Sequence, residues 1–208
     1  MGLLGRFLNG APAPTRLLLT RPGPVARGDV LYSHPGPPLA PAGRAAMAAL
    51  APALHAAGVQ AVYADDSAAG SEAAEILGRL LGVPWRTLPE LRERSWGAWE
   101  GLPFAEVRRR WPEAVRRFAE EEAAFAPPGG ERLLDALARA RTALRRLLAE
   151  HRGGTFLVVG NCTANRAALA LALPFLPPEE GLRLEQDEAR LTELRFYGED
   201  GVLVYLNR

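Results

Sequence analysis

The chain has 208 residues, of which 48% are hydrophobic and 24% charged, and its formal net charge at pH 7 is +1. This length and balance predict one globular domain with a large core. A near-neutral charge gives no electrostatic reason to expect binding to nucleic acid, and no apolar run approaches the roughly 20 residues of a membrane span. The single cysteine, Cys162, leaves no disulfide within the chain. We therefore expect a cytoplasmic protein.

The first half of the chain predicts an arm followed by strands and helices in alternation. Residues 1–14, which end in Ala-Pro-Ala-Pro, predict a short irregular arm, and residues 15–208 a single domain. Apolar runs predict strands over 16–20, 59–63 and 83–88. Apolar residues spaced three and four apart predict helices over 43–57 and 72–81, each followed by a glycine that ends it. A Gly/Pro-rich loop fills 21–41.

The second half continues the alternation. A loop that carries Glu93, Trp96 and Trp99 leads to a helical, lid-like stretch over 102–124, interrupted at Pro112. A long Arg-rich helix is predicted over 131–150, a strongly apolar strand over 156–160, and a further helix over 164–173. The segment 191–206, with its Gly-rich centre, predicts a β-hairpin.

This order of elements predicts a fold class and the position of a site. Strands that alternate with helices form a three-layer αβα sandwich around a mainly parallel central sheet. Ligands bind such sheets beyond the carboxyl ends of the strands. The loops 21–23 and 161–163 follow two of the predicted strands, so we expect them to lie together at the site.

Seven segments, in chain order, resemble the phosphoglycerate-mutase-like histidine phosphatase superfamily. LLLTRPG at 17–23 resembles its opening strand followed by Arg-His-Gly, and FLVVGNCTANRAAL at 156–169 resembles the strand and turn that normally read V-V-S-H-G-G. LRERSWGAWEG at 91–101 closely matches a loop of the family. The other four segments are PLAPAGR at 38–44, VYADDSAAGSEAAEIL at 62–77, PPGGERLLD at 127–135 and the closing hairpin. The resemblance implies a phosphoglycerate-mutase-like fold.

The resemblance also implies a site, and this sequence departs from it. In the family a histidine attacks the phosphoryl group, two arginines and a second histidine hold its oxygens, and a carboxylic acid protonates the leaving oxygen. Pro22 stands at the nucleophile position, Ala69 at the second arginine and Asn161 at the second histidine. Arg21 and Glu93 match the first arginine and the acid. We therefore expect little or no phosphoryl transfer.

The residues that remain allow two interpretations each. Arg21, with Asn161, is either an anion-binding remnant or part of a structural ion pair. Glu93 is either a surviving acid or a carboxylate held by backbone donors. His34 and Cys162 are the candidates for a substitute nucleophile, although a surface loop and a packed turn are the simpler interpretations.

Three functional hypotheses follow. The first is a catalytically inactive or strongly impaired family member that acts as a binding or interaction module, with a weakly bound anion or a protein as its partner. The second is an active phosphate-ester hydrolase that uses His34 or Cys162. The third is a structural role as a homo-oligomer or as part of a larger assembly. None of them calls for a cofactor; the adjacent Asp65 and Asp66 are weak evidence for a metal and would repel phosphate.

Overall fold

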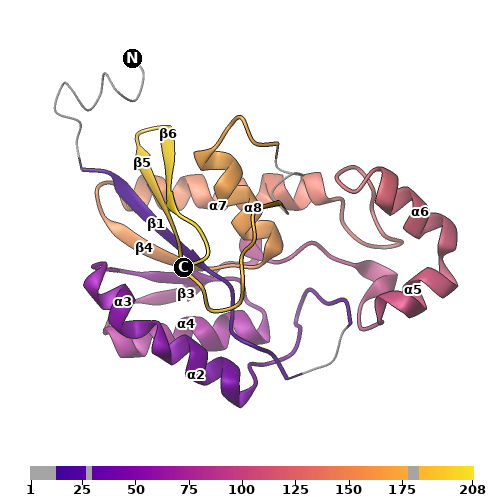
Figure 1. The fold of residues 1–208 in the computed structure, drawn as a ribbon, viewed down its shortest axis with the longest axis horizontal. Coiled ribbons are helices and arrows are strands. Elements are labelled where there is room, and N and C mark those ends of the chain that lie inside the picture. The colour runs from indigo at the N-terminus through magenta and orange to yellow at the C-terminus, as the bar shows by residue number, and fades with distance from the viewer. Residues whose placement is uncertain (1–12, 27–29, 178–182) are drawn as a thin grey trace.

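The computed structural model describes residues 13–26, 30–177 and 183–208, and its centre is a six-stranded sheet in the order β3-β2-β4-β1-β5-β6 (Figure 1). The first four of these strands are parallel to one another, whereas β5 and β6 are antiparallel additions at one edge. The strands are β1 (Thr15–Thr20), β2 (Val62–Ala64), β3 (Trp85–Thr87), β4 (Thr155–Val159), β5 (Thr192–Tyr197) and β6 (Asp200–Tyr205). The arm predicted over 1–14 lies mostly outside the described residues.

Helices cover both faces of the sheet. In Figure 1, α2 (Pro41–Ala49), α3 (Ala51–Ala56) and α4 (Ala68–Leu81) lie along one face, and α7 (Leu133–Glu150) and α8 (Cys162–Ala172) lie along the other. The three-layer αβα fold and the mainly parallel sheet are therefore confirmed.

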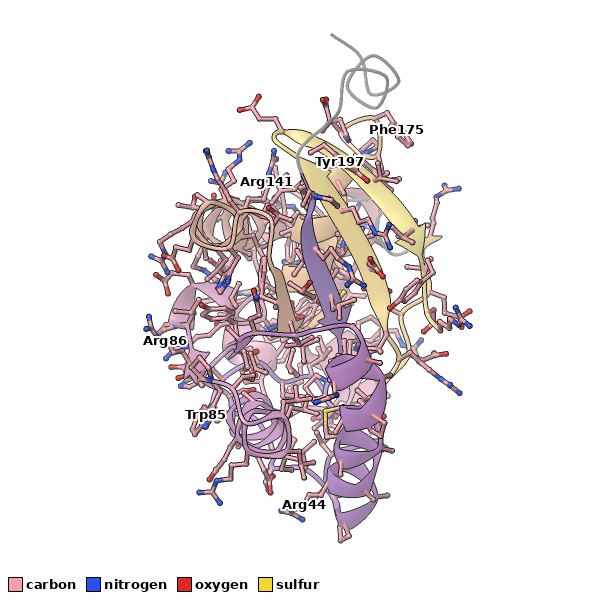
Figure 2. All side chains as sticks on the ribbon, turned by 90° about the vertical axis from the view of Figure 1, so that its left-hand side faces the viewer. Arg44, Trp85, Arg86, Arg141, Phe175 and Tyr197 are labelled. Carbon is pink, nitrogen blue, oxygen red and sulfur yellow. The ribbon has the colours of Figure 1, made fainter. Side chains whose placement is uncertain are left out.

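The central strands are apolar over most of their length because both of their faces are buried. Along β1, Leu17 and Leu19 belong to the core beneath α7 and α8, whereas Leu18 belongs to the core beneath α2 and α4. All three side chains are fully buried. Because successive side chains of a strand point to opposite faces of the sheet, one run of three leucines contributes to both cores. At the outer edge, β3 exposes Trp85 and Arg86 (Figure 2).

Two predicted helices have different bounds in the structure. The helix expected over 43–57 is divided at Leu50 into α2 and α3, because Pro52 in the first turn of α3 has no N–H to continue the α2 ladder. The helix expected from residue 72 begins at Ala68, because the Ser67 side chain caps it by accepting a hydrogen bond from the Gly70 N–H.

The lid-like stretch forms two helices that lie beyond one end of the sheet (Figure 1). They are α5 (Phe104–Arg110) and α6 (Pro112–Glu120), and the break falls at Pro112 as predicted. Buried Trp99, Val107 and Phe125 form a small third core beneath them, which Trp96 and Phe118 extend. This insertion supplies one wall of the pocket described below.

A buried ion pair joins the first strand to the closing hairpin. The Glu193 side chain is almost fully buried and accepts hydrogen bonds from Arg16 Nε at 2.9 Å and Nη2 at 3.2 Å, and from Arg195 Nε at 2.7 Å. A further Arg16 nitrogen donates to the Ala57 carbonyl at 2.7 Å. The network ties β1, β5 and the end of α3 together.

We expect this ion pair to make stability depend on pH. Burial acts to raise the pKa of Glu193, but the hydrogen bonds from Arg16 and Arg195 outweigh it and lower that pKa below the ordinary value. When the pKa of the folded state lies below that of the unfolded state, which is about 4.3 for a glutamate, the ionised group stabilises the protein at pH values above the unfolded-state pKa. This contribution is lost as the pH falls through the folded-state pKa. Glu193→Gln should therefore reduce the free energy of unfolding by about 1–3 kcal/mol at pH 7 and flatten its decline below pH 5. Urea denaturation at pH values from 7 to 3 measures both effects, with the exposed Glu113→Gln as control. An equal decline of the free energy of unfolding with falling pH in the wild type and both variants would contradict the assignment.

Candidate functional site

A pocket of about 340 Å³ opens where β1, β2 and β4 end, and we call it the strand-end pocket. Each of these strands is followed by a residue that lines it: Arg21 after β1, Asp65 after β2 and, one residue further on, Asn161 after β4. Trp96 and Phe118 line it from the side of the insertion. All five positions that the resemblance singled out, Arg21, Pro22, Ala69, Glu93 and Asn161, line this one pocket.

Asn161 is held by three hydrogen bonds within the protein. Its Oδ1 accepts from the Ala164 N–H at 2.9 Å and so caps α8. Its Nδ2 donates to Asp65 Oδ2 at 2.7 Å and to the Leu91 carbonyl at 2.8 Å. An amide nitrogen has two hydrogens, so both are engaged. An anion could gain a hydrogen bond from the Asn161 side-chain amide only by displacing one of these partners.

Glu93 is held at the start of α8. Its carboxylate accepts hydrogen bonds from the Thr163 N–H at 3.2 Å, from the Thr163 hydroxyl, and from the Arg94 N–H at 2.9 Å. A carboxylate beside a helix N-terminus is favoured by the helix dipole. These bonds match the interpretation in which backbone donors hold the carboxylate. No bond between Glu93 and Arg21 is among them.

Arg21 lines the strand-end pocket from the loop directly after β1. One of its terminal nitrogens donates to the Gln186 carbonyl at 3.0 Å, and its own carbonyl accepts from the Ala189 N–H. Its side chain makes no ion pair with any residue that the structure describes. Next to it, Pro22 has neither a nucleophilic side chain nor a backbone N–H.

Arg94 and Arg166 also line the pocket, although neither is among the site residues that the sequence predicts. Arg94 is 2% exposed; its terminal nitrogens donate to the carbonyls of Glu122, Phe125 and Glu131, and its guanidinium lies 4.8 Å from the centre of the Trp96 ring. Arg166 is 3% exposed and pairs with the Glu122 carboxylate at 3.1 Å. No local pattern marks a buried arginine, because its partners come from the distant insertion.

The pocket is not strongly positive. Its lining includes three arginines, Arg21, Arg94 and Arg166, and four carboxylates, Asp65, Glu93, Glu122 and Glu188. Much of the remaining wall is apolar, from residues such as Val25, Leu31, Trp96 and Phe118. A phosphate site usually concentrates cationic donors, and this composition differs from that arrangement.

The two candidate nucleophiles lie in different environments. Cys162 lines the pocket, but burial, reinforced by the nearby Glu93, raises the pKa of its thiol to about 11. His34 is not among the pocket-lining residues; its Nδ1 lies 3.5 Å from the Asp66 carboxylate, which Arg92 also binds through two hydrogen bonds of 2.6 Å. These bonds lower the pKa of Asp66. The aspartate pair is therefore divided, with Asp65 facing the pocket and Asp66 bound to Arg92.

Two further properties concern metals and membranes. Within residues 13–26, 30–177 and 183–208, no three His, Cys, Asp or Glu side chains come together as a metal-binding group. In the same part of the chain, no helix has the length and apolar character needed to cross a membrane.

The layered fold, the pocket at the strand ends and the arginine directly after β1 define a phosphoglycerate-mutase-like α/β protein. Residues 17–208 match the histidine phosphatase superfamily (branch 1), and the chain belongs to this family. It is 35% identical over 198 residues to the bifunctional protein Rv2228c of Mycobacterium tuberculosis, covering 93% of this chain. The chain spans 53% of the length of that relative.

Solved structures agree with this membership. YhfR from Bacillus stearothermophilus superposes with a TM-score of 0.83 at 27% identity, over 91% of this chain and 95% of its own. The mycobacterial glucosyl-3-phosphoglycerate phosphatase Rv2419c, in a complex with VO3, superposes with a TM-score of 0.81 at 26% identity, over 92% of this chain and 98% of its own. The phosphoglycerate-mutase-like fold predicted from the seven segments is therefore confirmed.

Proposed function

We propose that this chain is a binding protein built on the histidine phosphatase scaffold, with phosphoryl transfer lost or strongly impaired. The observation that carries the proposal is Pro22, which lines the pocket directly after Arg21, at the position that the family resemblance assigns to the nucleophilic histidine. None of the described residues that line the pocket is a histidine. Without a covalent acceptor no phosphoenzyme forms.

The other departures act in the same direction. Ala69 offers no donor, and Asn161 cannot carry a proton and has both amide hydrogens engaged. Each preorganised donor to a developing negative charge contributes a factor of about 10²–10³ in rate. The loss of several such groups therefore predicts a large further fall in rate beyond the loss of the nucleophile. In this proposal the protein acts in the cytoplasm, and its partner is a small ligand in the strand-end pocket or another protein, a second copy of this chain included.

The second candidate is a phosphate-ester hydrolase with a different nucleophile. Cys162 lines the pocket at the start of α8, and one similar structure is that of a phosphatase by name. A thiol whose pKa is raised to about 11 is ionised in only about one molecule in ten thousand at pH 7, and the thiolate is the nucleophile. The buried thiol therefore favours the first candidate.

Assays of phosphate-ester hydrolysis test the proposal. We expect the protein to hydrolyse p-nitrophenyl phosphate no faster than a heat-denatured sample and to form no phosphohistidine, because no histidine is among the described residues of the pocket. An active family member assayed in parallel shows that the conditions allow turnover. Cys162→Ser and His34→Ala should change nothing. Turnover that either substitution abolishes would contradict the proposal and establish the hydrolase.

A further inference from the structure

We propose that Asp65 sets the ligand specificity of the strand-end pocket: its carboxylate is a resident anion that excludes phosphate and selects a ligand with an apolar body and a hydrogen-bond-donating end, best an ammonium group. This inference rests on the proposed function, since it concerns what the same pocket binds in place of a phosphate ester.

The protein itself holds the Asp65 carboxylate in place. The side chain lies directly after β2, lines the pocket and is only 6% exposed. Oδ1 accepts hydrogen bonds from the Ser67 N–H at 3.0 Å and from the Ser67 hydroxyl. Oδ2 accepts from Asn161 Nδ2 at 2.7 Å. Asn161 stands at the position that the resemblance assigns to a phosphate-holding histidine, so a protein carboxylate now takes the hydrogen bond that this position offers.

The start of α4 is shaped around the same carboxylate. A Cβ atom on Gly70 would lie 2.2 Å from Asp65 Oδ1, so only glycine leaves room for it there. The N-terminus of a helix carries partial positive charge and stabilises an anion. The Asp65 carboxylate thus occupies the place beside the first turn of α4 where the negative charge of a ligand would otherwise be stabilised.

No cation among the residues that the structure describes forms an ion pair with Asp65. Arg92 is bound to Asp66 instead, and Arg166 to Glu122. Juxtaposed like charges cost several kcal/mol when a complex forms, so a phosphate next to Asp65 is disfavoured. Arg92 is close enough to interact electrostatically with Asp65, but an ammonium group in the pocket would add the direct ion pair that Asp65 lacks among the described residues.

The pocket also offers what such a ligand needs. A carboxylate oxygen has two lone pairs, and Oδ2 accepts one hydrogen bond from within the described protein. Val25, Leu31 and Phe118 provide apolar wall, and the volume of about 340 Å³ is within the range of small-molecule sites. A primary amine on a ring or short alkyl body can donate a hydrogen bond to Oδ2 and pack its apolar part against this wall.

Two probes with the same apolar body test the inference. Benzylamine and benzyl phosphate are titrated calorimetrically into the wild type, Asp65→Asn, Asp65→Ser and Asp66→Asn. We expect the wild type to bind benzylamine at least ~10-fold more tightly than benzyl phosphate, and both Asp65 variants to shift this ratio toward the phosphate by at least ~10-fold. Asp66→Asn should shift it by less than ~2-fold, because Asp66 is paired outside the pocket. Asp65→Asn keeps the shape of the side chain, and thermal unfolding confirms that each variant is folded.

The outcomes separate this inference from the proposed function. A wild type that prefers benzyl phosphate, that does not bind benzylamine at millimolar concentrations, or whose preference is unchanged by Asp65→Asn would overturn the role of Asp65. Hydrolysis of benzyl phosphate, measured in the same samples, would instead overturn the loss of catalysis, whichever probe binds more tightly.

Discussion

A variant with four substitutions, Pro22→His, Asp65→Ser, Ala69→Arg and Asn161→His, is expected to gain phosphatase activity that no single substitution confers. The four side chains line one pocket, so they meet at one bound phosphate. Pro22→His alone would supply a nucleophile without donors for the transferring group, and Ala69→Arg alone would place its guanidinium beside the Asp65 carboxylate. Groups that act as a unit have strongly non-additive effects, so we expect the combined variant to exceed each single variant by at least ~10² in kcat/KM.

The structure also identifies what opposes this gain. A Cβ atom on Gly23 would lie 2.6 Å from the Gly43 carbonyl oxygen, so the loop after residue 22 packs tightly against α2 and its path is constrained. Asn161→His removes the side-chain cap of α8, at a cost of about 1 kcal/mol. Neither effect is expected to unfold the protein.

The measurement is hydrolysis of p-nitrophenyl phosphate together with detection of phosphohistidine. The matched control carries the other three substitutions with Pro22→Ala, which removes the proline without adding a nucleophile. Circular dichroism confirms folding. A folded variant with all four changes and no gain over this control would show that the backbone of the pocket, as well as its side chains, has departed from an active geometry.

Arg94→Met is expected to cause a larger loss of stability than Glu193→Gln, about 3–5 kcal/mol in the free energy of unfolding. Arg94 connects the loop after η1 (Pro89–Leu91) to three carbonyls that all lie between α6 and α7, and truncation leaves these buried or partly buried acceptors without their donor. Burial lowers the pKa of Arg94, opposed by the nearby carboxylates of Glu122 and Glu93. Methionine keeps the apolar stem and removes the hydrogen bonds.

Chemical denaturation monitored by circular dichroism measures this loss. Arg116→Met serves as control, since Arg116 is an exposed helix residue whose ion pairs with Glu113 and Glu120 lie at the surface, and its expected effect lies within about 0.5 kcal/mol. Tryptophan fluorescence should change for Arg94→Met, because the guanidinium lies over Trp96. Equal midpoints for the two variants would mean that Arg94 does not hold the insertion in place.

Much of the fold could be predicted because its signals are local. Apolar runs mark strands buried on both faces, as in β1 and β4, and proline marks the break between α5 and α6. The bounds were less accurate where a single side chain decides them. Ser67 starts α4 four residues before the predicted start, and Pro52 divides α2 from α3. Neither residue alters the hydrophobic period on which the prediction relied.

The sequence by itself determined the fold class, and the resemblance of its segments to the family predicts that Pro22, Ala69 and Asn161 stand at the catalytic positions. Only the tertiary structure decided how the remaining polar groups pair. It brought Asp65 to Asn161 across 96 positions of the chain, Glu93 to Thr163 across 70, and Arg166 to Glu122 across 44. The physical reason is range: a strand or helix follows from neighbouring residues, whereas a hydrogen bond between side chains on separate loops depends on the packing of the whole sheet and its helices.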